Sequence, residues 1–224
     1  PQISFSQTIE TKEIANADYA SVIMYHRFGD SRYPSTNIKK EQFESHINEL
    51  IKPKYNVIDI KKALKAINEE ELINDRSIVI TIDDAYSSVF DYAWPIFKKH
   101  NLPFTLFVST DVIDKKIPGY MSWEEIRILR DNGITIGSKT KSHPQLHKLT
   151  NTQRIEGLTI SNKRFIDESG SKPSFFAYPY GEYSLEVLEL VIASWFLVGF
   201  SQSSVVANKS VGLYQLHSVS MNAI

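Results

Sequence analysis

Apolar runs and helix-like periodicities alternate along the chain from residue 21 onward. Strands are predicted where β-branched and aromatic residues follow one another, as in SIVITID at 77–83. Helices are predicted where apolar residues recur every three or four positions, as at Phe43, Ile47 and Leu50. The predicted strands cover 21–28, 55–60, 77–83, 104–110, 134–138, 174–181, 196–201 and 213–221, and the predicted helices cover 39–52, 60–69, 87–100, 122–133, 151–170 and 184–195.

Local sequence features add detail to two of these predicted helices. Ser122 is followed three residues later by Glu125, which is the pattern of a capping box at a helix start. Pro95 falls inside the helix predicted over 87–100. We expect a kink there, because proline removes one backbone hydrogen bond and crowds the preceding turn.

Strand and helix alternate without a linker or a change in composition, which indicates one α/β domain with a mostly parallel, barrel-like sheet. Residues 1–20 lack clear periodicity and are expected to form an N-terminal lead-in, so the domain is expected to cover 21–224. The repeating units are fewer than an eightfold barrel needs. Parallel barrels carry their chemistry at the carboxyl ends of the strands, and polar clusters follow several predicted strands here.

Composition excludes several classes of protein. The formal net charge is -1, so no basic excess points to a nucleic acid partner. The sequence has no apolar run of 18 or more residues that would predict a membrane-spanning helix. Cysteine is absent, which excludes disulfides and thiolate chemistry. The first residue is Pro1 rather than Met, and a cleaved signal peptide is one explanation that stays open.

Asp83 and Asp84 directly follow an apolar strand, a position where two carboxylates can divide the work. One can ligate a divalent metal while the other acts as a base. The alternative is a strand-terminal turn in which an aspartate caps the backbone.

His143 and His147 are four residues apart, and with Asp84 they would form a ligand set of two histidines and one carboxylate. Such a set suits Zn²⁺ in a hydrolase, and Co²⁺ or another divalent ion would also fit. Pro144 breaks any helix through the pair, so ideal geometry is not assumed. The alternative is a polar loop with two surface histidines.

Other candidates follow later strands. The turn Tyr178-Pro179-Tyr180-Gly181 could direct backbone N–H groups at an oxyanion and stack its rings on a sugar, or it could be a buried plug. His217 in the last predicted strand could act as a general acid or be packed in the core. His26 could line the same mouth, and Trp123 could form the rim of a sugar site instead of belonging to the core.

Four segments, taken in order, resemble motifs of the polysaccharide deacetylase family (NodB homology domain, carbohydrate esterase family 4), and the resemblance covers roughly residues 20–222. VITIDDAYSS resembles the family's T-F-D-D-G strand end, and IGSKTKSHPQL resembles its G-x-His-Ser/Thr-x-x-His-P-x-L motif. FAYPYGEYS resembles its R-x-P-Y-G motif, and the final LH resembles its Leu-x-His motif more weakly. SVIMYHRF is similar to the Tyr-His strand of its exopolysaccharide deacetylase branch.

The resemblance implies a distorted (β/α) barrel of about seven parallel strands and a metal-dependent removal of acetyl groups from sugars. It implies that Asp83 activates a metal-bound water and that Asp84 and His143 ligate the metal. It also implies that the backbone N–H of Tyr180 holds the oxyanion and that His217 protonates the leaving amine. Because polysaccharide substrates lie outside the cytoplasm, a secreted, periplasmic or cell-envelope location is expected.

Two departures from the family pattern change this picture. Lys139 stands where the motif has its first histidine, and a protonated lysine has no lone pair for a metal. His147 is the expected substitute ligand. Ala177 and Tyr178 stand where an arginine usually orients the catalytic aspartate, and we expect the Lys139 ammonium to partner Asp83 instead.

The leading hypothesis is therefore a metal-dependent deacetylase, with Zn²⁺ as the most expected ion, acting on polysaccharide of the N-acetylglucosamine type. A second hypothesis is a catalytically silent carbohydrate-binding domain that kept the fold. A third is an amidase for small non-sugar amides. The sequence does not indicate an oligomeric state.

Overall fold

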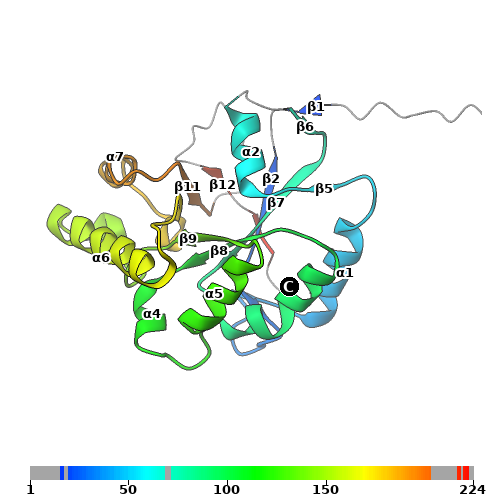
Figure 1. Cartoon of the computed structure of the whole chain (residues 1–224), viewed down its shortest axis with the longest axis horizontal. Coiled ribbons are helices and arrows are strands. Elements are labelled where there is room, and N and C mark those ends of the chain that lie inside the picture. Colours follow the sequence, from blue (N-terminus) through cyan, green and yellow to red (C-terminus); the bar gives the residue numbers. More distant parts are fainter. Residues whose placement is uncertain (1–15, 18–19, 69–71, 203–215, 218, 222–224) are drawn as a thin grey trace, which may run out of the picture.

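The structure is a computed structural model that describes residues 16–17, 20–68, 72–202, 216–217 and 219–221. Its centre is a curled sheet with helices around the outside (Figure 1). Every pairing within this sheet is parallel, in the order β12-β11-β10-β9-β8-β7-β2-β13, with β5 also paired to β7. Its strands are β2 (Ser21–Tyr25), β5 (Asn56–Val57), β7 (Ser77–Asp83), β8 (Thr105–Val108), β9 (Thr135–Ser138), β10 (Phe175–Ala177), β11 (Val198–Ser201), β12 (Leu216–His217) and β13 (Val219–Ser220).

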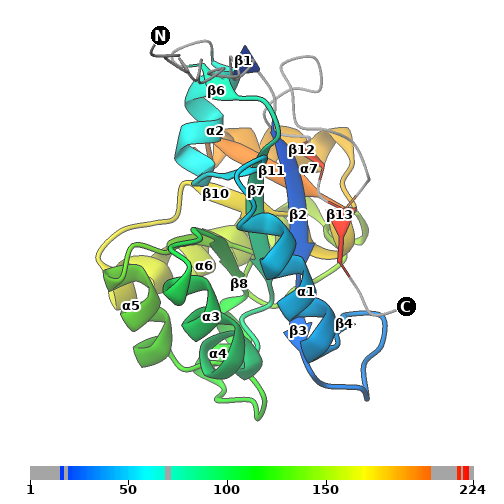
Figure 2. The ribbon, with the colours of Figure 1, turned by 90° about the vertical axis from the view of Figure 1, so that its right-hand side faces the viewer.

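The two ends of this sheet are formed by neighbouring stretches of the chain. His217 of β12 pairs with Ser201 of β11, and Val219 of β13 pairs with Ile23 of β2 (Figure 2). A sheet whose first and last strands follow each other in sequence must curl back on itself. The predicted distorted, mostly parallel barrel in a single domain is therefore confirmed.

The helices agree closely with the periodicity, apart from one short helix that was not predicted, α4. The capping box predicted at Ser122 and Glu125 is present, and Gly170 closes α6 in the left-handed conformation with φ 78°. The helices are α1 (Lys40–Leu50), α2 (Ile60–Ile67), α3 (Trp94–Lys99), α4 (Thr110–Asp114), α5 (Trp123–Asp131), α6 (Asn151–Ser169) and α7 (Leu185–Ala193).

The helix predicted over 87–100 is divided in two. A π-helical turn, Val89–Ala93, precedes α3, and Pro95 lies in the first turn of α3. A proline is tolerated in a first turn, because the N–H that it lacks has no partner there. The predicted kink therefore takes the form of a change in helix type before the proline.

Two small sheets lie beside the main one (Figure 2). β1 (Asn16–Ala17), at the end of the predicted lead-in, pairs antiparallel with β6 (Ile73–Asn74). β3 (Arg27–Phe28) pairs in parallel with β4 (Asn37–Ile38). The strand predicted over 21–28 is thus interrupted at His26. Residues 1–15 and 18–19 of the predicted lead-in, and residues 213–215 and 218 of the strand predicted over 213–221, lie outside the described residues.

β7 is buried along its whole length and forms the centre of the core. Ile80 and Ile82 are fully buried together with Phe43 of α1 and Phe97 of α3. Burial of both faces explains why this strand is a continuous apolar run instead of an alternating one. Within the part of the chain that the structure covers, no helix has both the length and the apolar character needed to cross a bilayer.

Gly137 in β9 has no room for a side chain. A Cβ atom there would lie 2.4 Å from the ring of Phe107, which is fully buried. We expect Gly137→Ala to lower the free energy of unfolding by about 1–3 kcal/mol through overpacking, measured by urea titration. Gly157→Ala in α6 is the matched control, because a Cβ there meets nothing within 4 Å and the helix should gain about 0.5–1 kcal/mol. Destabilisation of equal size in both variants would contradict the steric explanation.

Candidate active site

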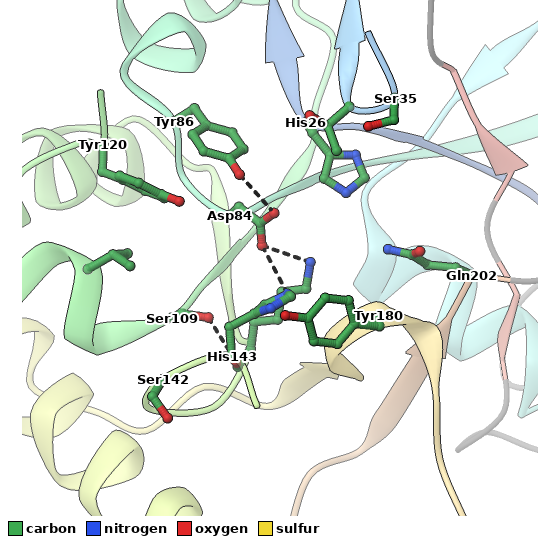
Figure 3. A pocket seen from close by; sticks show the side chains of 13 residues that line it. His26, Ser35, Asp84, Tyr86, Ser109, Tyr120, Ser142, His143, Tyr180 and Gln202 are labelled. Carbon is green, nitrogen blue, oxygen red and sulfur yellow. Dashed lines mark hydrogen bonds and ion pairs between the residues drawn. The ribbon is translucent and has the colours of Figure 1, made fainter. Parts of the chain in front are cut away.

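A polar cavity of about 580 Å³ opens at the carboxyl ends of the sheet strands (Figure 3). The residues that directly follow β2, β7, β8, β9 and β11 all reach it, as expected for a parallel barrel. Its lining residues are His26, Ser35, Thr36, Asp84, Tyr86, Ser109, Val112, Tyr120, Lys139, Ser142, His143, Tyr180 and Gln202.

The side chain of Lys139 is buried and is held between two carboxylates. Its Nζ lies 2.7 Å from Oδ2 of Asp83 and 2.8 Å from Oδ1 of Asp84. The predicted contact between Lys139 and Asp83 is confirmed, and the contact with Asp84 was not foreseen. Burial acts to lower the pKa of Lys139, but the two carboxylates more than reverse this and raise it, so the ammonium is charged at neutral pH.

The backbone fixes both ends of this contact. The N–H of Lys139 donates to the carbonyl of Val108 at 2.8 Å, and Oγ of Ser109 donates to the carbonyl of Lys139 at 2.8 Å. Asp84 has a φ of 72°, in the left-handed region, and its N–H donates to the carbonyl of Phe107 at 3.0 Å. In a regular strand, successive side chains point to opposite faces of the sheet. The left-handed turn at Asp84 interrupts this pattern, so that Asp83 and Asp84 both reach the ammonium of Lys139.

Asp84 is the carboxylate that faces the cavity, between Tyr86 and His143 (Figure 3). The hydroxyl of Tyr86 donates to its Oδ2 at 3.4 Å. Burial acts to raise the pKa of Asp84, but the charge of Lys139 and the nearby His143 lower it to about 2. The carboxylate is therefore ionised at neutral pH.

Two histidines face the cavity with unpaired ring nitrogens. Nε2 of His143 is 3.5 Å from Oδ1 of Asp84, and the His143 ring lies edge-on to the ring of Tyr180, with centroids 4.6 Å apart. Nε2 of His26 is 4.0 Å from Oδ2 of Asp83. Burial lowers the pKa of both histidines, so both are neutral at pH 7. Nε2 of His143 and Nδ1 of His26 are buried and have no hydrogen-bond partner among the described residues, so each is available to water or a polar ligand.

His147 is not brought to this site. Its Nδ1 lies 3.3 Å from Oε2 of Glu182 at the surface, and it does not line the cavity. The expected ligand set of Asp84, His143 and His147 is therefore wrong in its third member. Pro144 and the 3₁₀ turn Leu146–Lys148 carry the second imidazole away from the first.

Three predicted substrate-binding residues do not line the cavity and have structural contacts instead. Tyr178 is 1% exposed and its ring packs against Phe176 and Tyr183, which matches the alternative of a buried plug. Pro179 is buried beside it. The indole N–H of Trp123 donates to Asp114 on the outer surface, so Trp123 does not form a rim of the cavity. Tyr180 and His26 do line it, as predicted.

The two remaining catalytic candidates are placed differently. Asp83 lies behind Lys139, is 3% exposed and does not line the cavity. His217 is positioned by its backbone pairing with Ser201 of β11, and its side chain lies outside the described part. Its role as an acid stays a prediction.

Sequence reasoning did not find Tyr86 and Tyr120 as lining residues. Their rings lie 4.8 Å apart, and an isolated bridge joins their backbones. Tyr86 stands two residues after Asp84 and could have been suggested by that spacing. Tyr120 comes from the loop after α4, which no sequence pattern linked to a strand end.

The residues of this cavity do not fit the divalent metal that the resemblance implies. Asp84 and His143 could supply two metal ligands. The ammonium of Lys139 lies where a third ligand would be needed, and it has no lone pair to offer a metal. Catalytic zinc sites normally use three protein ligands. No group of three His, Cys, Asp or Glu side chains that could hold a metal occurs among the described residues.

A cavity with histidines and a carboxylate at the strand ends of a parallel barrel is typical of an enzyme active site. The family model for polysaccharide deacetylases matches residues 73–193. The chain therefore belongs to the polysaccharide deacetylase family, whose members hydrolyse N-acetyl groups.

Two curated relatives are similar over most of the chain. A putative polysaccharide deacetylase, YxkH of Bacillus subtilis (strain 168), is 26% identical over 198 residues, which cover 88% of this chain and 70% of the relative. The poly-beta-1,6-N-acetyl-D-glucosamine N-deacetylase of Staphylococcus aureus (strain MSSA476) is 24% identical over 204 residues, which cover 84% of this chain and 69% of the relative.

Solved structures share the fold. The deacetylase PplD of Streptococcus pyogenes, in complex with acetate, has a TM-score of 0.84 at 17% identity and covers 91% of this chain and 92% of its own. IcaB of Ammonifex degensii has a TM-score of 0.80 at 23% identity and covers 92% of this chain and 93% of its own.

Proposed function

We propose that this protein removes N-acetyl groups from a polysaccharide of the N-acetylglucosamine type. The observation that carries the proposal is the cluster of Asp84, Lys139 and His143, which forms one wall of the 580 Å³ cavity. The relative from S. aureus, named for its action on poly-beta-1,6-N-acetyl-D-glucosamine, supports this class of substrate. Such polymers lie outside the cytoplasm, so we also propose a secreted or cell-envelope location.

The cluster can hydrolyse an amide without a metal. Neutral His143 can take a proton from water through its unpaired Nε2, and the water oxygen then bonds to the acetyl carbon. An ammonium has three N–H donors, and the two carboxylates use two of those of Lys139. The third, with the backbone N–H of Tyr180, can stabilise the resulting oxyanion. The C–N bond then breaks, and His143 returns its proton to the amine nitrogen as acetic acid leaves and loses its own proton to become acetate.

Aromatic side chains around the mouth of the cavity suit a sugar ring. Tyr86, Tyr120 and Tyr180 all line it, and Tyr180 is 51% exposed. Tyrosine offers an apolar face for the sugar together with a hydroxyl for its polar groups. This arrangement favours a carbohydrate over a small non-sugar amide.

The test is acetate release from β-1,6-linked and β-1,4-linked N-acetylglucosamine oligomers, with and without a chelator. We expect release from one of the two linkages, and we expect it to persist after chelation. Asp84→Asn should lower the rate of release, because the Asp84 carboxylate holds the Lys139 ammonium in the wall of the cavity. Absence of release from both linkages would refute the proposal, and release from simple acetamides at equal rates would point to the amidase alternative.

A silent carbohydrate-binding domain is the second candidate. The observation that favours it is the ammonium of Lys139, which fills the position expected for a metal-ligating histidine. Isothermal titration with the same oligomers separates the two candidates. Binding without acetate release would establish the silent domain.

A further inference from the structure

A cation belonging to the protein already lies where the two carboxylates of the cavity converge. Nζ of Lys139 is 2.7 Å and 2.8 Å from the nearest oxygens of Asp83 and Asp84, distances typical of charge-assisted hydrogen bonds. The side chains of Lys139, Asp83 and Asp84 are 1%, 4% and 15% exposed. Water therefore does little to screen these charges.

The same contacts exclude a second cation. An ion bound to Oδ1 of Asp84 would have to share that oxygen with an ammonium only 2.8 Å away. Two positive charges at such short range in a buried site repel each other strongly. Movement of Lys139 away from Asp84 would also break its buried ion pair with Asp83, which opposes such a movement.

Without the ammonium, the remaining donors would suit a metal. Oδ1 of Asp84 and Nε2 of His143 are 3.5 Å apart. Two ligands, each about 2.1 Å from a tetrahedral zinc ion, are separated by about 3.4 Å. Nε2 of His143 has no hydrogen-bond partner among the described residues, so it is free to coordinate. A third metal ligand is lacking. Residue 139, which directly follows β9, is the position from which a side chain already reaches Asp84.

We propose that the Lys139 ammonium permanently replaces the divalent metal in this cavity, and that the site lacks metal binding because of this one side chain. The proposal goes beyond the proposed function and does not depend on it, because binding of a metal is measured without substrate. The cavity keeps a positive charge next to Asp84, but the charge is part of the chain and is not lost to a chelator.

The experiment compares wild-type protein with Lys139→His and Lys139→Arg. Zinc binding is measured by isothermal titration, and Co²⁺ binding by the visible absorption of a tetrahedral site. We expect no cavity metal in the wild type or in Lys139→Arg, which keeps the positive charge. Lys139→His should bind one ion per chain and should show the spectrum of a tetrahedral Co²⁺ site, which the wild type lacks.

Two further substitutions locate the ion. In the Lys139→His background, His143→Ala should abolish the tetrahedral Co²⁺ spectrum, whereas His147→Ala should change the affinity by no more than about twofold. A folded Lys139→His protein that binds no metal would overturn the proposal, since another feature would then exclude the ion.

The wild-type protein provides a test that does not depend on the folding of Lys139→His. Its thermal midpoint should be the same in chelator and in added Zn²⁺. One zinc ion per wild-type chain that is lost in His143→Ala would overturn the proposal directly. Failure of acetate release would leave these results unchanged, so the two proposals fail independently.

Discussion

Lys139→Ala is expected to lower the free energy of unfolding at pH 7 by about 3–5 kcal/mol. The substitution leaves the carboxylates of Asp83 and Asp84 next to each other in a site where their common ammonium was 1% exposed. Removal of one partner of a buried ion pair is costly mainly because the remaining charge stays buried. Urea unfolding followed by circular dichroism measures the effect.

The pH dependence separates this explanation from a simple loss of packing. In the wild type the pKa of Asp84 is about 2, below its ordinary 3.8, so its stabilising contribution is present above about pH 4 and is lost as the pH falls toward 2. In Lys139→Ala, burial should instead raise the pKa of Asp84, so the variant should recover stability as the pH falls from 7 to 5. A deficit that is constant over this range would contradict the electrostatic account.

Lys115→Ala is the matched control for the loss of a lysine. Nζ of Lys115 lies 2.8 Å from Asp111, but its side chain is 63% exposed. An exposed pair of this kind contributes less than about 1 kcal/mol. The two lysines differ in burial and in the number of carboxylates that each contacts, two for Lys139 and one for Lys115.

His143→Ala is expected to lower kcat/KM for acetate release by about 100-fold or more, the usual contribution of a general base. The imidazole is neutral, lines the cavity and has a buried Nε2 without a hydrogen-bond partner among the described residues. Initial rates of acetate release from the preferred N-acetylglucosamine oligomer measure the effect. Circular dichroism confirms that the variant is folded.

His147→Ala is the informative comparison, because the sequence pattern predicted the same role, that of a metal ligand, for His143 and for His147. The His147 side chain pairs with Glu182 at the surface and does not line the cavity, so we expect kcat/KM to stay within about twofold of the wild type. Equal losses in the two variants would contradict the placement of His147.

Much of the fold could be predicted because the local signals agree with the final packing. The continuous apolar run of β7 and the capping box of α5 are present at their predicted positions. The interruption between β2 and β3 at His26 could not be predicted, because it depends on the pairing of β3 with β4. α4 is only five residues long and has too few turns to show a period.

The sequence could predict which strand ends contribute residues to the candidate site, but not how each side chain is oriented there. The prediction that Asp84, His143 and Tyr180 lie in one site agrees with the structure, because each follows a strand of the same parallel sheet. The direction of His147 depends on a 3₁₀ turn and on Glu182, which lies 35 positions further along the chain (182 − 147). Long-range pairing of this kind leaves no trace in local periodicity.

The closure of the sheet by β12 and β13 has a consequence for how the chain folds during synthesis. β2 is made early, but its partner β13 begins at Val219, and β11 likewise waits for β12. Until residues 216–220 have left the ribosome, β2 and β11 each lack this sheet partner, and unpaired strand edges are templates for association with other chains. A product that is stalled or truncated before β12 should therefore depend on chaperones far more than a chain that contains both β12 and β13.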